Sequence, residues 1–564
     1  SLESPHPYGV LPAGNRFLLE ENSNSSTSSN KSENERFFGQ FQKDDIWLQI
    51  LAFLDGKTLA SVVQTCRFLY VAGHQPELWR DLVLRRQDAQ GKGTNGTTKA
   101  AIEKMADSWK DTYVLLYHNE LACPSKPMKI PGIYSDDLYR LHSCRAFAFP
   151  SSWLRETPFQ GKCSVPSVKT EDLTVQTFVE TYENPNVPVL IKGACQSWKA
   201  FRDWQDPNYL REHANGRTFR ATSGGAPLPA NFSLEAFQKY CNNPHTEEAP
   251  LYLFDREALQ PNTPLHQDYY PDLQASCPYF DPERAFDEDD IVGHDLFQVL
   301  GEGKRPDHTW KITGGNHSGT VFHIDPNATN AWNAAIVGRK RWIFYPPGVT
   351  PPGVHPSSDG DEVALPLSLG EWILTFWKEH QEFKRTAKPS DRPLECTAFP
   401  GDVIFVPHGW WHMVINLDAP FNIAVTHNYV SRANLGNVLR FLKLKEEQIS
   451  GCRDRAESIK PDKLHAAFVQ ALEDKFGTDT KWLAEAKRQS ESHWTCRAWK
   501  DGDPTQDQTR DDTKNKNTTC SVMPMCKKQR TADALDVKHA TSSCSSSVIS
   551  KAKAESAPFS FSFL

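Results

Sequence analysis

The chain has 564 residues, which corresponds to about three to four domains at about 150 residues per domain. Its 63 Lys and Arg residues against 70 Asp and Glu residues give a net charge of −7, which argues against direct nucleic-acid binding by a generally cationic chain. No stretch is long and apolar enough for a transmembrane helix, and hydrophobic residues make up only 38%, so we expect ordered domains with polar tails.

Both ends of the chain are polar. Residues 1–40 contain a run of Ser, Asn and Thr, and residues 496–564 are rich in Ser and Thr. We expect a disordered leader and a disordered tail, because neither can bury enough apolar surface to offset its ordering entropy. The basic cluster CKKQR at 526–530 fits a solvated tail or a nuclear address. Thirteen cysteines without CxxC pairs, and a start without a secretory signal pattern, indicate a protein of the nucleus or cytoplasm that is not secreted.

Residues 41–85 have the apolar spacing of short helices. The run DDIWLQILAFL places Trp47, Leu51 and Leu54 in one stripe, and Thr58 is in position to cap a second helix. About 45 residues make a marginal core, so this apolar surface packs either on the rest of the chain or on a partner.

The same segment has a second, more specific pattern. It combines an acidic start, a helix reading IWLQILAFL, a helix reading VVQTCRFLY and then ELW. Over residues 41–82 this pattern resembles an F-box. The resemblance implies docking to the Skp-type adaptor of a cullin–RING ubiquitin ligase through the apolar stripe.

The character of the chain changes again after the F-box-like segment. Residues 86–165 are a mixed linker with several prolines, and residues 166–430 contain many short β-like runs broken by Gly and Pro, such as VPVLIKG and GDVIFVP. Such runs predict a barrel or a sandwich. Helical spacing returns over residues 431–495.

One imidazole and one carboxylate form the core of a candidate metal site. His323 and Asp325 stand at positions i and i+2 of a predicted strand, so their side chains point to one face. Two histidines of GDVIFVPHGWWHMVINL compete for the third position. A proline and a glycine flank His408 and predict a turn, whereas HMVINL continues as a strand, so we expect His412 to be the ligand. Two histidines and one carboxylate are typical of mononuclear non-haem Fe(II) with open positions.

A lysine follows the first two ligands inside the predicted strand GRKRWIFY. An interior lysine such as Lys340 must be paired, because an unpaired buried ammonium is costly, and the distal carboxylate of 2-oxoglutarate would pair it. Arg339 and Arg341 alternate with it and are expected to face the other side, toward solvent. Asn333 and Asn416 either face the same pocket or are core amides that the backbone satisfies.

Residues 166–430 resemble the JmjC oxygenases, most of all the phosphatidylserine-receptor-like group of bifunctional arginine demethylases and lysyl-hydroxylases. The segments that carry the resemblance are SGTVFHIDPNATNAWNAAIVGRKRW, PGDVIFVPHGWWHMVINLD, APLYLFD and HDLFQVLGEGKRPDHTWKITGG. It implies an α+β fold: a double-stranded β-helix (a jelly-roll or cupin-like barrel) preceded by a small all-α F-box and followed by helices. It also implies these roles: iron ligands His323, Asp325 and His412; 2-oxoglutarate contacts Lys340, Thr426, Asn333, Tyr252 and Thr320; substrate-side residues Trp411, Asn416 and Asn428.

Three features leave questions open. Strand alternation alone places Thr320 opposite His323, so its role rests on the resemblance. The segment DAPFNIAVT is longer than in the family, so the role of Thr426 depends on where the extra residues lie. The insert at 261–290 is longer and more acidic, and it either lines the substrate entrance and favours basic peptides or forms a solvated loop.

The leading hypothesis is an Fe(II)- and 2-oxoglutarate-dependent oxygenase that consumes O2 and acts on basic side chains of proteins. It would hydroxylate lysine or remove methyl groups from arginine or lysine, and its F-box would connect it to a ubiquitin ligase. The alternative is an F-box substrate adaptor whose barrel mainly binds. A cupin isomerase or a metal-storage barrel is a third possibility, but it gives no reason for Lys340.

Overall fold

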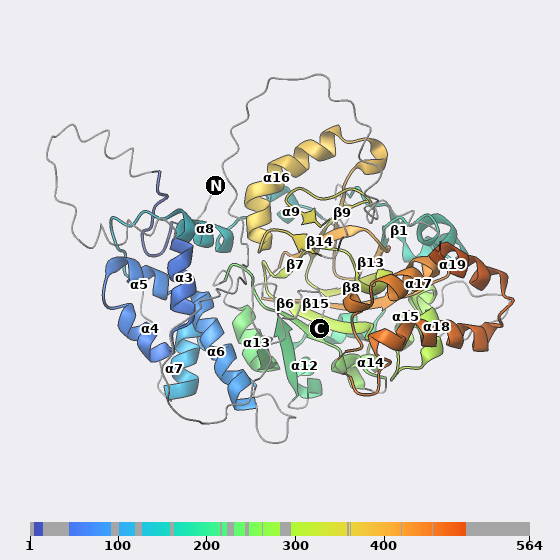
Figure 1. Cartoon of the computed structure of the whole chain (residues 1–564), viewed down its shortest axis with the longest axis horizontal. Coiled ribbons are helices and arrows are strands. Elements are labelled where there is room, and N and C mark those ends of the chain that lie inside the picture. The colour runs from blue at the N-terminus through green and yellow to red at the C-terminus, as the bar shows by residue number, and fades with distance from the viewer. Residues whose placement is uncertain are drawn as a thin grey trace, which may run out of the picture.

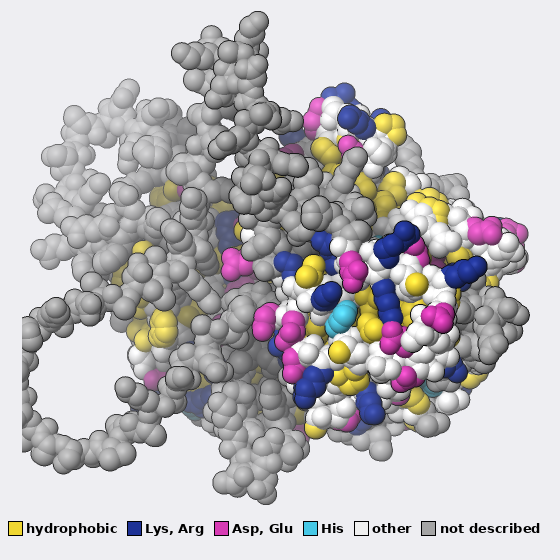
Figure 2. Space-filling view, turned by 45° about the vertical axis from the view of Figure 1, so that its right-hand side comes forward, with side chains coloured by type: hydrophobic (Ala, Val, Ile, Leu, Met, Phe, Trp, Pro, Cys, Tyr) yellow, Lys and Arg dark blue, Asp and Glu magenta, His cyan; other side chains and the backbone are white. Residues whose placement is uncertain are grey.

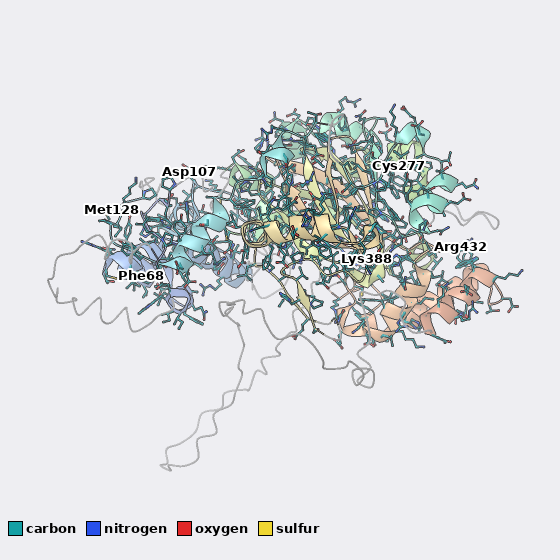
Figure 3. All side chains as sticks on the ribbon, turned by 90° about the horizontal axis from the view of Figure 1, so that it is seen from above. Phe68, Asp107, Met128, Cys277, Lys388 and Arg432 are labelled. Atoms are coloured by element: carbon teal, nitrogen blue, oxygen red, sulfur yellow. The ribbon has the colours of Figure 1, made fainter. Side chains whose placement is uncertain are left out.

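The computed structural model describes fourteen stretches of the chain. Figures 1 and 3 show three parts in a row: helices of the N-terminal part, a β-barrel in the middle, and the C-terminal helices at the far end. Three predicted segments lie outside the described residues. They are the leader except for its residues 5–14, the last four residues of the predicted helical stretch (492–495) and the whole tail (496–564). The described residues are 5–14, 44–91, 101–118, 127–157, 163–214, 217–222, 230–242, 247–261, 263–281, 295–357, 360, 362–418, 420–453 and 455–491.

The N-terminal part is entirely helical. Asp55 caps α4, because its carboxylate accepts hydrogen bonds from the backbone N–H groups of Lys57 and Thr58, each at 2.9 Å. The prediction that Thr58 is the cap was therefore wrong: the carboxylate three residues earlier reaches the free N–H groups, and Thr58 lies inside the helix. The helices are α3 (Asp44–Ala52), α4 (Gly56–Val62), α5 (Arg67–Gly73), α6 (Pro76–Gly91), α7 (Trp109–His118), α8 (Asp136–Arg145) and α9 (Ser151–Leu154).

Helix α3 turns a different apolar face to solvent than the sequence predicted. Leu51 is only 2% exposed, and Trp47 and Leu54 pack against the same core. The exposed apolar side chains are instead Ile46, Ile50 and Phe53, and Phe53 is 86% exposed. The stripe predicted for docking is therefore part of this protein's own core. An adjacent face, formed by Ile46 and Ile50 of α3 and by Phe53 just after it, is exposed to solvent and is here called the α3 surface.

Two β-sheets form the predicted double-stranded β-helix, which the structure confirms. The large sheet has the strand order β1-β2-β13-β8-β15-β6-β5-β3-β4, and the small sheet has the order β12-β9-β14-β7. The strands of the large sheet are β1 (Ser167–Lys169), β2 (Val189–Lys192), β3 (Thr218–Thr222), β4 (Ala230–Ser233), β5 (Tyr252–Asp255), β6 (Thr309–Gly314), β8 (Asn330–Val337), β13 (Val403–Val406) and β15 (Asn422–Tyr429). Those of the small sheet are β7 (Gly319–His323), β9 (Lys340–Tyr345), β12 (Leu394–Ala398) and β14 (Trp411–Asn416). A separate two-stranded ribbon pairs β10 (His355–Pro356) with β11 (Val363–Ala364).

Strand alternation divides the side chains of both sheets between the barrel interior and two outer layers. Trp342 and Val414 of the small sheet pack against Ile404 of the large sheet inside the barrel. Outside the small sheet, Ile343 and Met413 pack under helix α16 (Leu369–Thr386). The outer face of the large sheet joins the main core, which is continuous with that of the N-terminal helices. The helices along this face are α10 (Val175–Phe178), α11 (Lys199–Asp203), α12 (Pro207–Ala214), α13 (Leu234–Cys241), α14 (Pro264–Gln267) and α15 (Tyr270–Ser276).

Arg341 corrects one prediction about strand β9. It points away from the barrel interior, as alternation requires, but it is buried and not solvated. Its guanidinium pairs with Glu156 and Glu395 at 2.6 Å each, because the segment around α9 covers this part of the sheet. Arg339 lies nearer the surface and pairs with Asp418 at 2.7 Å.

The C-terminal helices form a core of their own against the barrel. They are α17 (Leu435–Leu444), α18 (Pro461–Phe476) and α19 (Lys481–Glu491), and they bury a row of Leu, Val and Phe side chains. On the coloured part of the face in Figure 2, positive and negative side chains are interspersed, in keeping with the mild net charge. None of the helices within the described stretches is long and apolar enough to cross a membrane.

A buried ionic cluster fixes the N-terminal helices to the barrel domain. Glu247, which precedes β5, is fully buried and accepts hydrogen bonds from Trp109 of α7 and from the hydroxyl of Tyr240 at 3.1 Å. Arg80 of α6 lies 3.3 Å from the same carboxylate, and the neighbouring backbone N–H of Glu248 donates to Glu77 at 3.0 Å. The two parts are therefore joined by buried charged and polar groups that bond across their boundary.

Replacing Arg80 with Ala should destabilise the protein by about 3–5 kcal/mol, because the substitution leaves a buried carboxylate without its cation. The matched control is Arg202→Ala, which removes an arginine that is 73% exposed and whose ion pair with Asp203 is screened by water, so this variant should lose little stability. Urea denaturation followed by tryptophan fluorescence measures both. Equal losses of stability in the two variants would show that the buried pair does not hold the two parts together.

Candidate metal and 2-oxoglutarate site

The barrel encloses a pocket between its two sheets, here called the active-site pocket. Its cavity volume is about 80 Å³, and side chains from β5, β6, β7, β8, β9, β14 and β15 line it. Most of these point inward by strand alternation. Most of the residues predicted from the sequence to form the site meet in this one cavity: Tyr252, Thr320, His323, Asp325, Asn333, Lys340, His412, Thr426 and Asn428.

Three of these residues form a candidate metal centre. The imidazole Nε2 atoms of His323 and His412 lie 3.9 and 3.8 Å from the same carboxylate oxygen, Oδ1 of Asp325. The ligand atoms of the three residues all lie within 4.8 Å of one another. The other carboxylate oxygen of Asp325, Oδ2, is buried without a hydrogen-bond partner. Two imidazoles and one carboxylate at this spacing, with an unused oxygen, fit a divalent metal such as Fe(II).

The histidine rings are oriented for metal binding by the backbone. The Nδ1 atom of His323 lies 2.9 Å from the carbonyl oxygen of Val321, and that of His412 lies 3.1 Å from the carbonyl oxygen of Trp410. These hydrogen bonds place the proton on Nδ1 and leave Nε2 free as a ligand atom. Burial lowers the pKa of His323 to about 3 and that of His412 to about 4, so both rings are neutral at pH 7.

Burial also acts on the carboxylate of the metal centre. It raises the pKa of Asp325 to about 6, and the nearby His323 and the amide of Asn428 offset only part of this shift. A desolvated carboxylate of this kind gains most from a cation, because no solvent competes for its charge.

A β-bulge in strand β7 decides the position of Thr320. In the pairing of β7 with β14, His323 lies opposite His412 and Thr320 opposite Val414, so three steps on β7 match two on β14. The extra residue on β7 reverses the alternation, and Thr320 and His323 face the same cavity. The bulge also supplies the Val321 carbonyl that orients His323.

Lys340 lies on the inner face of β9 and is 1% exposed. Its ammonium donates hydrogen bonds to the hydroxyl of Tyr252 at 2.6 Å and to Oδ1 of Asn416 at 3.0 Å. Both partners are neutral, and within the described stretches the lysine has no ion pair. Burial lowers the pKa of Lys340 to about 7. A carboxylate that entered this pocket would find a preformed cationic partner.

Two further residues stand beside the lysine and the metal centre. Thr426 of β15 and Asn333 of β8 are paired in register, and both side chains line the cavity. Oδ1 of Asn333 is buried without a hydrogen-bond partner, and the hydroxyl of Thr426 donates to the backbone carbonyl of Trp332 at 2.8 Å. Three groups of the pocket therefore fit a metal with an acidic co-substrate. They are the amide oxygen of Asn333, Oδ2 of Asp325 and the ammonium of Lys340, which has hydrogen bonds but no ion pair within the described stretches.

The three residues predicted for the substrate side have different places. Asn428 lines the cavity, where its amide donates to Thr329 at 3.0 Å. Trp411 was wrongly placed: it precedes His412 in β14, so it points out of the barrel and packs under α16. Asn416 is not on the substrate side either, because it is bonded to Lys340 and to Ser318, and it positions the lysine.

His408, the rejected candidate ligand, lies in the turn between β13 and β14. Its Nε2 atom lies 2.7 Å from the side-chain nitrogen of Asn437 on α17, outside the metal group. Of the insert at 261–290, the described part forms α14 and α15, and Leu265, Tyr270 and Leu273 are buried. This part is folded into the core and is not a solvated loop; residues 262 and 282–290 lie outside the described residues.

An aromatic wall of the pocket was missed from the sequence. Trp310 and Ile312 of β6 pack with Tyr252, and Phe254 joins them. Asp307 and His308, just before β6, line the pocket as well. The alternation in HTWKITGG would have placed Trp310 and Ile312 on one face, but no charged or metal-binding residue marked that face as functional.

Comparison with known proteins agrees with this architecture. Residues 175–434 match the family profile described as a cupin-like domain, and residues 44–85 match the profile described as F-box-like. The chain is 36% identical over 463 residues to arginine-specific demethylase JMJ22 of Arabidopsis thaliana, with 80% of each chain covered. The similarity to that protein therefore extends beyond the barrel.

Two more distant relatives share mainly the barrel. The chain is 32% identical over 278 residues to the bifunctional arginine demethylase and lysyl-hydroxylase psr-1 of Caenorhabditis elegans, covering 48% of this chain and 62% of that one. It is 28% identical over 288 residues to the 2-oxoglutarate and iron-dependent oxygenase JMJD4 of Homo sapiens, covering 49% of this chain and 65% of that one.

Binding of 2-oxoglutarate should be coupled to proton uptake by Lys340. Below pH 7 the ammonium is already charged, whereas above pH 7 the neutral amine must take up a proton when the dianion binds. The affinity should therefore fall by about tenfold per pH unit above pH 7. Calorimetry with Mn(II) in place of iron, in two buffers of different ionisation enthalpy at pH 8, should show uptake of close to one proton. Uptake that persists in Lys340→Met would assign the proton to another group.

Proposed function

We propose that the chain, which belongs to the JmjC family of cupin-like, iron- and 2-oxoglutarate-dependent oxygenases, oxidises side chains of proteins. Its targets are lysine, or N-methylated arginine or lysine. The single observation that carries this proposal is that one cavity contains both a two-histidine, one-carboxylate group and a buried ammonium that has no counter-ion among the described residues. A barrel that only binds a protein partner has no need of both.

The chain's own residues supply the binding and the positioning for this chemistry. Iron together with 2-oxoglutarate, when bound, supplies the activation of O2 that oxidises a C–H bond. His323, Asp325 and His412 would hold the metal, and Lys340 with Tyr252 would bind the distal carboxylate of 2-oxoglutarate. The aromatic wall makes one side of the same cavity apolar, and a low local dielectric strengthens each of these polar contacts.

The substrate class is inferred from the relatives and from the pocket wall. JMJ22 is an arginine-specific demethylase by name, and psr-1 is named for both arginine demethylation and lysyl hydroxylation. Phe254 and Trp310 present aromatic rings to the cavity, which suits the alkyl stem and the cation of a lysine or a methylated arginine. Either basic side chain fits this wall, and mass spectrometry of the products distinguishes lysine hydroxylation from demethylation.

A second function is proposed for the N-terminal helices, namely recruitment to a cullin–RING ubiquitin ligase. The F-box-like match covers residues 44–85, and the α3 surface exposes Ile46 and Ile50 of α3 and Phe53 of the turn that follows it. These residues stand at helical positions i, i+4 and i+7. An apolar face of this kind is suited to the Skp-type adaptor. Both functions fit one molecule, because the α3 surface and the active-site pocket lie in different parts of the chain.

The His412→Ala variant should lose iron and all product formation, because it removes one of the three ligands. The matched control is His408→Ala, four residues earlier in the turn outside the metal group, which should keep its iron. Iron content after anaerobic reconstitution gives the first readout. Mass spectrometry of lysine and dimethylarginine peptides gives the second, since hydroxylation adds one oxygen atom and demethylation removes a methyl group and releases formaldehyde. Full iron content in His412→Ala would refute the assignment.

The Ile50→Asp/Phe53→Asp double variant should lose binding of the Skp-type adaptor in a pull-down, because it places two charges on the α3 surface. Oxygenase turnover should be retained, since the barrel has its own interior packing. Leu444→Asp on α17 is the control, because it introduces an aspartate at an exposed apolar residue outside the α3 surface. Undiminished adaptor binding by a folded double variant would contradict the F-box assignment. Leu51→Asp, by contrast, should unfold the helical part, because Leu51 is buried.

A further inference from the structure

A second pocket, here called the side pocket, adjoins the active-site pocket. Its cavity volume is about 50 Å³, and it shares two lining residues, Asp307 and His308, with the active-site pocket. The other walls come from the segment after β5, from the segment before β6, from β15 and from Arg455. A peptide whose target side chain enters the first cavity therefore has this second cavity within reach along the same wall.

Among the residues that the structure describes, the charged groups that line the side pocket leave one positive charge unbalanced. Arg256 and Arg455 both pair with the same oxygen of Asp307, at 2.6 and 3.1 Å. Two guanidiniums therefore share one carboxylate. Arg305 is matched by its own partner, Asp295, in a fully buried pair.

The remaining titratable groups do not restore this balance. Burial lowers the pKa of His266, His308 and His427, so all three rings are neutral at pH 7. Glu302 is the other carboxylate on the wall; its side chain is 47% exposed and lies 3.6 Å from His308, so water screens its charge.

Besides Nε of Arg455, which is ion-paired with Asp307, two further buried nitrogen atoms of the side pocket lack a hydrogen-bond partner. Nε of Arg305 can only donate, and the residue is 1% exposed. Nδ1 of His266 is also unpaired, and its ring is held by stacking on Tyr270 at 4.7 Å between centroids. A buried donor without an acceptor is costly, so Nε of Arg305 favours a ligand with acceptor oxygens, and Nδ1 of His266 does the same in the tautomer that carries its proton there. Donors together with one excess positive charge select an anionic acceptor over a neutral one.

We propose that the side pocket binds a carboxylate, supplied either by an acidic side chain of the protein substrate close to the oxidised residue or by a free small carboxylate. The first source rests on the proposed protein-oxygenase function, and it makes Arg256, Arg455 and Arg305 determinants of sequence specificity. The cavity has room for one carboxylate group with few waters.

The first arm of the test measures peptide binding without turnover. Fluorescein-labelled peptides with a central lysine or dimethylarginine carry Glu or Gln at each flanking position in turn, and anisotropy is measured anaerobically with saturating Mn(II) and 2-oxoglutarate. We expect Glu to bind about tenfold more tightly than Gln at one or two positions, which is about 1.4 kcal/mol. In Arg256→Gln and Arg455→Gln this ratio should fall close to one.

The matched control is Arg217→Gln. Its side chain is 31% exposed and lies 3.7 Å from Asp255, whereas that of Arg256 is 29% exposed, so the two variants remove equally accessible charges beside an aspartate. Arg217 does not line the side pocket. A ratio that falls equally in Arg217→Gln and in Arg256→Gln would come from net charge alone and would overturn the proposal.

The second arm separates the two sources and does not depend on a peptide substrate. Thermal shift is measured with propionate, which has the carboxylate of a glutamate side chain, and with propionamide, its neutral counterpart, in enzyme saturated with Mn(II) and 2-oxoglutarate. Saturable stabilisation by propionate but not by propionamide, lost in Arg256→Gln and kept in Arg217→Gln, supports a carboxylate site. If this result is found and no peptide binds, the side-pocket proposal stands and only the proposed protein substrate is refuted. Equal binding of Glu and Gln peptides together with no effect of propionate would overturn the side-pocket proposal.

Discussion

The site depends on the burial of one ammonium group. Lys340 stands on the inner face of β9 with a hydroxyl and an amide as its hydrogen-bond partners, and burial lowers its pKa to about 7. A desolvated lysine without a counter-ion is costly for a fold that has only to be stable. The cost is understandable if an acidic ligand completes the pair. Asn416 and Tyr252 hold the ammonium in place, and Ser318 in turn holds Asn416, so the binding site for the acid is built before the acid arrives.

The F-box-like helices are joined to the barrel through buried charges and a continuous apolar core, and not through a flexible linker alone. Glu247 receives hydrogen bonds from both parts, and Arg80 of α6 lies beside it. The active-site pocket and the α3 surface therefore have a fixed relation within one molecule. If the α3 surface binds the adaptor of a ligase, a protein bound at the pocket is presented to that ligase in a defined orientation.

Much of the site could be predicted from the sequence, because a strand projects residues i and i+2 to one face. His323, Asp325 and His412 meet as that rule requires, and Lys340 faces the same cavity. The same rule applied to Trp411 would have placed it outside, since it is adjacent to His412, and there the family resemblance misled. Thr320 is the opposite case, because a bulge in β7 reverses the alternation and no residue pattern announces that bulge. Burial of Arg341 and of Leu51 depends on what covers them, and this is information about distant parts of the chain that local periodicity does not contain.

The central claim is that one cavity binds iron through His323, Asp325 and His412 and binds 2-oxoglutarate against Lys340. The most direct measurement is an anaerobic titration of the Fe(II)-loaded protein with 2-oxoglutarate, followed by visible charge-transfer absorption. The account predicts a saturable absorption band that requires both iron and 2-oxoglutarate. Lys340→Met should need a much higher concentration to reach the same band, and His412→Ala should give no band. The account would be contradicted by a wild-type protein without the band, or by saturation at the same concentration in Lys340→Met as in the wild type.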